Sequence, residues 1–377
     1  MKKEKTIAKD LIEFIWNSPS AFHVVENMKA ELLQKGFQEL NERECWKPEA
    51  GKGYFVVRND SSMIAFRIPK KEVKGFHVIA THSDSPTFKL KEQPELVAEE
   101  HYIRLNTEKY GGMIHSAWLD RPLSVAGRIL IKDEKQKLVT KLVNVEKDLL
   151  VIPNPAIHMN RDINKGYEYN PQVDLLPLMG LGNKESAKEL LLKTVAESAK
   201  VKKEDIVASD LFLYVREKGK LTGLQEEFVL SPKLDDLQCV HASLRAFTEA
   251  GPEKYINVLA VFDNEEVGST TAQGADSTFW KDTLERIGEA LGWTREEMHC
   301  KRAESFLISA DNAHAVHPNH PEKADPANRP YLGGGLVIKY HSGQKYTTDG
   351  VSAAYMKMWC EEADVPYQTF YNRSDMA

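Results

Sequence analysis

The sequence of 377 residues is poor in cysteine and contains no long apolar run. Its four cysteines are widely scattered and show no paired spacing, which argues against both a disulfide framework and a thiolate zinc site. They are Cys45, Cys239, Cys300 and Cys360. No segment approaches the roughly 20 apolar residues that span a membrane. The charged N-terminal segment also lacks the apolar core of a signal peptide. These absences favour a protein of the reducing cytoplasm without a membrane partner.

An excess of positive charge is absent as well. The net charge is -6, with 28% charged and 42% hydrophobic residues, which is ordinary for a globular enzyme. Because nucleic-acid binding depends on a basic surface, nucleic acid is not expected as a partner. The length suggests two domains, or one α/β fold that carries an insertion.

The first part of the chain alternates in the way expected of an α/β fold. Apolar periodicity predicts helices over residues 5–16 and 22–35, separated by a Pro-Ser turn. Short β-branched or aromatic runs predict three strands, at residues 54–58, 62–68 and 75–80.

Hairpin-like segments follow, and the alternation of strands and helices then returns. The middle segments are strands at 125–132, 137–143 and 211–215, with a helical stretch near 184–200. The later ones are helices at 234–248 and 279–291 and strands at 255–262 and 306–310. We therefore predict a mixed sheet flanked by helices, built from residues 1–90 and 231–377, with an inserted, mainly β domain over 91–230.

Two adjacent glutamates, Glu265 and Glu266, follow the apolar run at 258–262. Ligands collect at the carboxyl ends of strands in open α/β sheets, and neighbouring carboxylates repel one another unless a cation compensates. The pair therefore indicates either a metal site or a solvated acidic loop. Side chains that are adjacent on extended backbone point apart, so we expect the two glutamates to have different roles.

Further potential ligands end other segments of the chain. His82 and Asp311 follow apolar strands, and Asp235 and Asp236 open a helix. Imidazole and carboxylate ligands without thiolates suit a catalytic zinc, manganese or cobalt site. Asp84 lies two residues after His82 and could accept the second ring N–H of that histidine. The alternatives are a turn histidine at His82 and a helix cap at the aspartate pair.

Four ordered motifs resemble those of the aspartyl aminopeptidase family of cocatalytic zinc exopeptidases, and the likeness extends over essentially the whole chain. They lie at residues 81–86, 232–237, 263–269 and 309–319. The resemblance implies a zinc-exopeptidase-like fold whose inserted domain mediates dimerisation. It also implies large homo-oligomers, in which dimers assemble into a shell that admits short or unfolded peptides.

The resemblance also implies roles for individual residues. Asp235 would bridge two zinc ions, and His82 and Asp311 would complete the site of one of them. Glu266 would bind the other zinc, and Glu265 would be the general base for a water activated by both metals. Asp84 would orient His82.

Three further residues match family positions that contact the substrate. His158 matches a histidine that reaches into a neighbouring subunit, and His314 matches one near the metals. Lys339 matches a lysine of the pocket for an acidic side chain, which a cation would bind favourably. A solvated or packing role is the alternative for each of the three.

The family pattern continues beyond Ala377 to a final histidine that completes the second metal site. His341 precedes that segment and is a poor substitute. We therefore expect the second metal to be weakly held, either because the sequence is a truncated form or because the chain has lost activity.

Together these observations predict a metal-dependent aminopeptidase that removes N-terminal residues, Asp or Glu among them, from peptides. Zinc is the expected metal, with manganese or cobalt as alternatives. Two other functions stay open: a cocatalytic carboxypeptidase or deacylase, and a catalytically silent assembly protein of the same fold.

Overall fold

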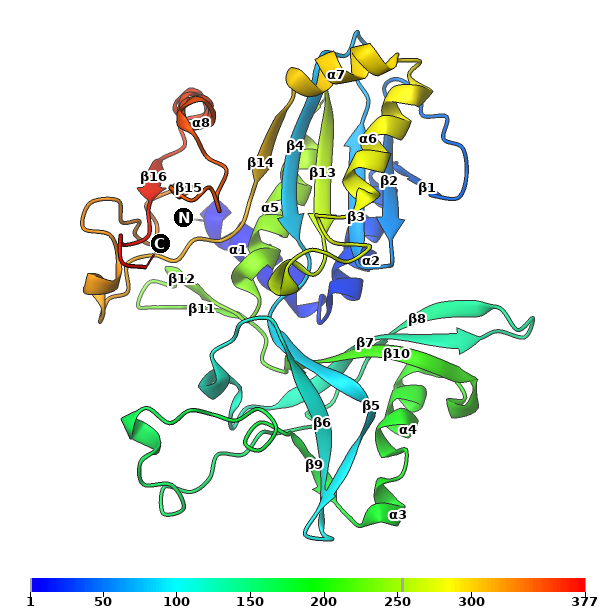
Figure 1. Ribbon diagram of the computed structural model, residues 1–377, viewed down its shortest axis with the longest axis vertical. Coiled ribbons are helices and arrows are strands. Elements are labelled where there is room, and N and C mark those ends of the chain that lie inside the picture. Colours follow the sequence, from blue (N-terminus) through cyan, green and yellow to red (C-terminus); the bar gives the residue numbers. More distant parts are fainter. Residues whose placement is uncertain (1, 252–253, 377) are drawn as a thin grey trace. The chain divides into compact units, whose positions relative to one another are not determined.

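A computed structural model describes residues 2–251 and 254–376 of the chain. The chain divides into two compact units, Met1–Ala310 and Asp311–Ala377. The first unit contains two six-stranded sheets, and the second contains a pair of short strands (Figure 1).

The first sheet has the strand order β1-β2-β3-β13-β4-β14. Its strands are β1 (Gln38–Leu40), β2 (Gly53–Arg58), β3 (Ser62–Arg67), β13 (Tyr255–Phe262), β4 (Gly75–His82) and β14 (Phe306–Ser309). Both β13 and β14 run parallel to β4, whereas β3 runs antiparallel to β13 and β2. Three neighbouring strands therefore have their carboxyl ends at the same edge of the sheet, where α/β proteins place their ligands.

Helices cover both faces of the first sheet. They are α1 (Lys2–Trp16), α2 (Ala21–Gln34), α5 (Leu234–Glu249), α6 (Thr278–Ala290) and α7 (Arg295–Ala303). Along β13, Val258 and Ala260 pack with residues of α6 and α7, whereas Leu259 and Val261 pack with residues of α1, α2 and α5. Since successive strand residues point to opposite faces, the part of a strand that is covered on both sides is expected to be a continuous apolar run, as residues 258–262 of β13 are. This explains why β13 has the bounds predicted from its apolar run.

The second sheet has the order β8-β7-β10-β5-β6-β9, and all of its pairings are antiparallel. Its strands are β8 (Leu138–Asn144), β7 (Leu123–Lys132), β10 (Ile206–Val215), β5 (Thr87–Ala98), β6 (Tyr102–Tyr110) and β9 (Leu178–Leu181). The helix α4 (Leu190–Ala199) packs Leu191, Val195 and Ala199 into its core. Observed strands overlap the predicted strands at 125–132, 137–143 and 211–215.

The helical stretch predicted near 184–200 is interrupted. It forms α3 (Lys184–Ala187) and α4, and Glu189 between them has a left-handed backbone, with φ 55°. The carboxylate of Glu95, on β5, accepts a hydrogen bond of 2.9 Å from the backbone N–H of Leu191. A contact distant in sequence thus satisfies the first turn of α4 and lets a new helix begin there.

The remaining elements of the first unit are short. They are the hairpin of β11 (Lys220–Thr222) and β12 (Phe228–Leu230), and 3₁₀ turns at His115–Trp118, Ile163–Lys165, Lys203–Asp205 and Glu265–Val267.

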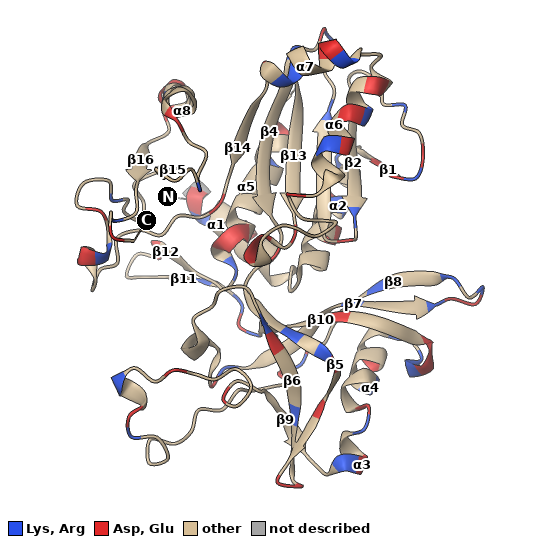
Figure 2. Cartoon of the chain, viewed as in Figure 1, with Lys and Arg blue, Asp and Glu red and all other residues tan. Residues whose placement is uncertain are grey.

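The second unit pairs β15 (Leu336–Lys339) with β16 (Tyr367–Phe370) in parallel. It also contains a 3₁₀ turn, Pro321–Lys323, and the helix α8 (Gly350–Glu362). Across the described part of the chain, no helix is long and apolar enough to cross a membrane. Basic and acidic residues are interspersed along most elements (Figure 2), in keeping with the nearly balanced charge of the sequence.

Candidate active site

Predicted ligands follow the carboxyl ends of the three parallel strands. His82 is the last residue of β4 and pairs in register with Phe262, the last residue of β13. The backbone N–H of Ala310, just beyond β14, donates to the carbonyl of Ala80 at 2.8 Å. Asp311 is the next residue of the chain. The parallel order of the strands thus brings the polar segments after them to one edge, as expected from the sequence.

His82 lies among carboxylates at the start of α5. Its Nε2 is 3.5 Å from Asp235 Oδ1, and its backbone N–H donates to Asp236 Oδ2 at 3.2 Å. Each of these three residues offers a ligand atom within 4.8 Å of those of the other two. Asp236 is fully buried, whereas the side chain of Asp235 is 55% exposed. One imidazole and two carboxylates form a donor set that suits zinc, so the residues present fit the metal that the sequence predicts.

Both aspartates precede the regular part of α5, because neither has helical backbone angles. The residue at the cap position of this helix is Lys233, whose amine donates to the carbonyl of Ser18 at 2.9 Å. The acidic start of α5 is visible in Figure 2.

The carboxylates around His82 strongly shift the pKa of its imidazole. Burial by itself lowers the pKa of this imidazole, but hydrogen bonds with Asp235 and Asp84 and the charges of Asp236 and Asp84 outweigh burial and raise the pKa to about 11. A cation is thus favoured at this position, whether it is a proton or a metal ion.

Asp84 is buried and has four hydrogen-bond partners. Its Oδ1 lies 3.3 Å from His82 Nδ1 and accepts from the backbone N–H of Glu265 at 3.2 Å. Its Oδ2 accepts from the Tyr110 hydroxyl at 2.6 Å and from the backbone N–H of Glu266 at 3.2 Å. Asp84 therefore contacts His82, as expected, and also holds the backbone of both glutamates.

The expectation that Glu265 and Glu266 lie on extended backbone is wrong. Asn264 adopts a left-handed conformation, with φ 62°, and Glu265–Val267 forms a 3₁₀ turn. The turn exposes Glu265 and half-buries Glu266. Burial, followed by the charge of Asp84, raises the pKa of Glu266 to about 7. The two side chains do occupy different environments, but the turn is the cause.

The structure also describes the surroundings of the three residues that are predicted to contact the substrate. In the second unit, the Lys339 amine donates to Asp311 Oδ2 at 2.9 Å, and the exposed ring of His314 packs edge-on against Phe370. In the first unit, His158 is exposed in a turn at residues 157–159. The roles given to these residues remain predictions.

Tyr110 and Asn264 also belong to this network, although neither is predicted as a site residue from the sequence. The Asn264 amide donates to the Tyr110 hydroxyl at 2.8 Å. Burial first, and the charge of Asp84 second, raise the pKa of Tyr110, so its hydroxyl remains a proton donor. The signal in the sequence is weak: a tyrosine followed by two glycines, Gly111 and Gly112.

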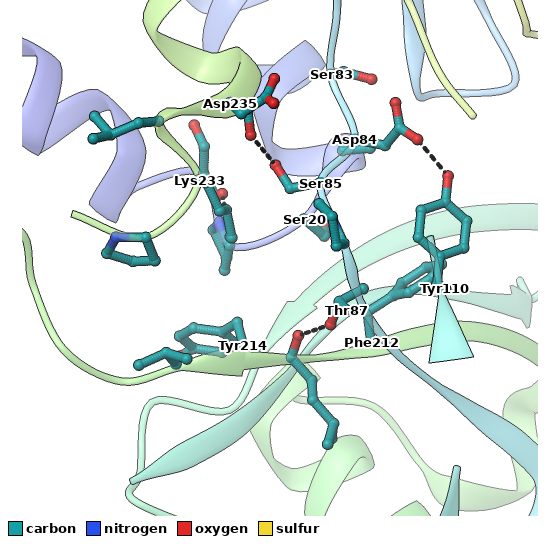
Figure 3. A pocket seen from close by; sticks show the side chains of 18 of the residues that line it. Ser20, Ser83, Asp84, Ser85, Thr87, Tyr110, Phe212, Tyr214, Lys233 and Asp235 are labelled. Carbon is teal, nitrogen blue, oxygen red and sulfur yellow. Dashed lines mark hydrogen bonds between the residues drawn. The ribbon is translucent and has the colours of Figure 1, made fainter. Parts of the chain in front are cut away.

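A cavity of about 350 Å³ lies in the first unit beside Asp84 and Asp235. Figure 3 shows Tyr110, Phe212 and Tyr214 around it, with the Ser85 hydroxyl donating to the carbonyl of Asp235 on one side. Of the predicted metal ligands, only Asp235 borders this cavity.

Comparison with known proteins identifies the family. The profile of the aminopeptidase I zinc metalloprotease family, M18, matches residues 14–377. This chain belongs to the M18 family. A relative from Clostridium novyi, named probable M18 family aminopeptidase 2, is 50% identical over 379 residues, which cover 100% of this chain and 88% of that protein. Aspartyl aminopeptidase 1 of Schizosaccharomyces pombe is 39% identical over 399 residues, which cover 98% of this chain and 84% of that protein.

Solved M18-like structures have the same fold. The chain superposes on the cryo-EM structure of a complex of Ape4 and Nbr1 with a TM-score of 0.95 and 38% identity, over 98% of this chain and 75% of that one. The mApe1 dodecamer of S. cerevisiae gives a TM-score of 0.83 and 26% identity, over 98% and 85%. The M18 chain is therefore a metallo-aminopeptidase, a hydrolase of peptide bonds, and the predicted α/β fold and zinc dependence are confirmed.

Proposed function

We propose that this M18 chain removes N-terminal residues from peptides, with a preference for Asp or Glu, at the edge formed by β4, β13 and β14. The observation that carries the proposal is the meeting of His82, Asp235 and Asp236 next to the turn of Glu265, within a member of a zinc aminopeptidase family. The acidic preference is suggested by the name of the S. pombe relative.

Four residues are proposed to hold zinc: His82, Asp235, Glu266 and Asp311. Zinc bound by such ligands polarises the scissile carbonyl and lowers the pKa of water. The charges around His82 and Glu266 support a cation there, because several negative groups lie close together at this edge.

Glu265 is proposed as the general base. Its side chain is exposed at the start of the 3₁₀ turn, while its backbone N–H is fixed by Asp84. A carboxylate that can reach solvent on a fixed backbone is suited to take a proton from the attacking water and to return it to the leaving amine. Asp84 is proposed to orient His82 through the 3.3 Å contact with Nδ1.

Lys339 is proposed to recognise an acidic side chain, with His314 and His158 positioning the substrate. Its amine already makes a charge-assisted bond with a carboxylate, Asp311, and this contact illustrates the kind of group it can bind.

Homo-oligomers are proposed to form through residues 91–230, with dimers assembling into a larger shell. The solved mApe1 assembly of S. cerevisiae is a dodecamer. Large apolar side chains of this segment are exposed, among them Met159 at 80% and Leu224 at 96%, and burial in a subunit interface would remove them from water. The cytoplasm is the proposed location, since Cys45, Cys239, Cys300 and Cys360 are all free thiols.

A panel of substrates tests the proposal. Zinc, manganese or cobalt is added to the chain, and hydrolysis of Asp-, Glu- and Leu-amides is followed together with N-acetylated peptides. We expect cleavage of substrates with a free amine and none of the blocked ones. Cleavage of blocked peptides from their carboxyl end would instead identify a carboxypeptidase, and removal of their acetyl group would identify a deacylase. No cleavage of any substrate, with intact oligomers, would favour a silent assembly protein.

A further inference from the structure

We propose that the end of β6 in the second sheet is a positioning element of the active site, in which Tyr110 holds Asp84 and Gly111 makes room for Glu266. This inference rests on the proposed function for the meaning of Asp84 and Glu266. It adds that residues at the end of a strand of the second sheet keep these two carboxylates in place.

The position of Tyr110 is fixed by its backbone and its ring. It is the last residue of β6 and pairs with Thr87, the first residue of β5. Its ring packs edge-on against Phe212 of β10, with 5.6 Å between centroids. The strand thus delivers the hydroxyl to the edge of the first sheet, where it lies 2.6 Å from Asp84 Oδ2 (Figure 3).

The hydrogen bonds of Asn264 determine which way the Tyr110 hydroxyl donates its proton. Asn264 Oδ1 accepts from the Thr271 hydroxyl at 2.7 Å and from the Gln273 amide at 2.8 Å. With its oxygen engaged in this way, the amide nitrogen of Asn264 faces Tyr110 and donates to its hydroxyl oxygen at 2.8 Å. The single proton of the hydroxyl is then directed to Asp84.

Asp84 would lose orientation without this proton. It is only 4% exposed, so water has little access to replace a missing donor. A hydroxyl bond to a carboxylate at 2.6 Å is in the short, charge-assisted range, whereas the backbone bonds from Glu265 and Glu266 are each 3.2 Å long. Tyr110 therefore provides the shortest of the contacts that hold Asp84 against His82.

Gly111 leaves space for the side chain of Glu266 because it has no Cβ. Its φ is +75°, and a Cβ built on it would lie 2.9 Å from Glu266 Cβ and 3.2 Å from Glu266 Oε2. The backbone at the end of β6 therefore packs directly against Glu266, and any larger residue would push that side chain away.

The first test removes only the hydroxyl. Tyr110→Phe is compared with Tyr214→Phe, which removes another hydroxyl of the second sheet, bonded to Asn144 Oδ1 at the same distance of 2.6 Å. Zinc affinity is measured by competition with a chelating dye, kcat and KM on an amino-acid amide, and Tm in the absence of metal. We expect Tyr110→Phe to lower zinc affinity or kcat about 10- to 100-fold, with a Tm close to that of Tyr214→Phe.

The second test uses backbone geometry as its control. Gly111→Ala is compared with Gly292→Ala, because Gly292 has nearly the same φ, +76°, but a Cβ added to it would meet nothing within 4 Å. Both variants carry the strain of a left-handed alanine, and only the first displaces Glu266. We expect weaker zinc binding in Gly111→Ala alone.

The outcomes separate this inference from the proposed function. Zinc affinity and kcat that stay within about twofold of wild type in Tyr110→Phe, or fall no further than in Tyr214→Phe, would overturn the positioning role. If the wild type cleaves no amide, the proposed aminopeptidase activity fails, while the zinc affinities still decide whether Tyr110 and Gly111 position the site.

Discussion

The two sheets of the first unit have equal numbers of strands but contribute very differently to the site. In the first sheet, β13, β4 and β14 are parallel neighbours, so the segments after them gather at one edge. In the antiparallel second sheet, neighbouring strands end at opposite edges, and among the contacts described above only the end of β6 reaches the site. Strand direction therefore decides how many side chains a sheet can bring to one place.

The two sheets also differ in what their interiors require. The first sheet is covered on both faces by helices, and residues 258–262 of its central strand, β13, are all apolar and buried. The second sheet places charged residues on its strands, and Asp210 on β10 pairs with Lys89 at 2.9 Å and Arg128 at 3.0 Å. The comparison predicts that changes at the edge of the first sheet affect chemistry, whereas similar changes in the second sheet, away from the end of β6, affect stability.

The largest effect is expected from Glu265→Gln. If Glu265 moves the proton, kcat should fall about 10²- to 10⁴-fold, while KM and zinc affinity change little. Glu108→Gln removes the same charge from an exposed position on β6 and should leave all three values unchanged. Equal activity of the two variants would contradict the assignment of Glu265 as the general base.

Asp235→Asn should affect zinc binding, whereas Asp210→Asn should affect stability. Loss of a proposed ligand should weaken zinc binding by more than the roughly 10- to 100-fold typical of residues outside the ligand set. Asp210→Asn should instead lower the free energy of unfolding by roughly 1–3 kcal/mol, because it breaks charge-assisted bonds, with zinc affinity unchanged. Titration with zinc and urea unfolding measure the two quantities, and weak zinc binding by both variants would break the comparison.

Acidification should lower the free energy of unfolding through His23, which lies beside a packing contact with the second sheet. This residue follows Phe22, whose ring lies 6.4 Å from that of Phe212 in the second sheet. Burial, and secondly the charge of Lys233, lower the pKa of His23 from 6.5 to about 4. The unfolded chain therefore binds the proton more readily, so the contribution to stability is complete above pH 6.5 and is lost as the pH falls toward 4.

Between pH 7 and pH 5 this single group should cost about 2 kcal/mol of unfolding free energy. Urea unfolding at both values, for wild type and His23→Gln, isolates its share. A pH dependence that is the same in both proteins would show that His23 does not couple folding to protonation.

The smallest effect is expected at Lys339, which belongs to neither sheet. Lys339→Met should reduce the preference for Asp-amide over Leu-amide by about tenfold in kcat/KM, the value of one charge-assisted hydrogen bond. Lys345→Met, an exposed lysine of the same unit, should preserve the preference. If Leu-amide hydrolysis falls as much as Asp-amide hydrolysis, Lys339 supports the site without selecting the substrate.

The elements that could be predicted are those whose sequence pattern has a local cause. The largely apolar run at 255–262 predicted β13 because burial on both faces favours apolar residues on both sides of the strand. His82 and Asp311 could be singled out as candidate ligands because strand ends are where an α/β sheet offers sites, and the ordered motifs indicated the family.

What could not be predicted depends on contacts between distant segments. The 3₁₀ turn of Glu265 follows from the left-handed backbone of Asn264, whose amide is held by residues later in the chain. The break before α4 depends on Glu95, almost a hundred residues away. The role of Tyr110 depends on where β6 ends in space, which no local pattern of residues specifies.

The hydrogen bond between Tyr110 and Asp84 changes how deletions in this protein should be interpreted. A shortened chain without residues 91–230 would lose Tyr110 and Gly111 together with any subunit contacts. Inactivity of such a chain would therefore not measure the importance of assembly. To separate the two, subunit contacts should be disrupted by point substitutions that leave the end of β6 intact.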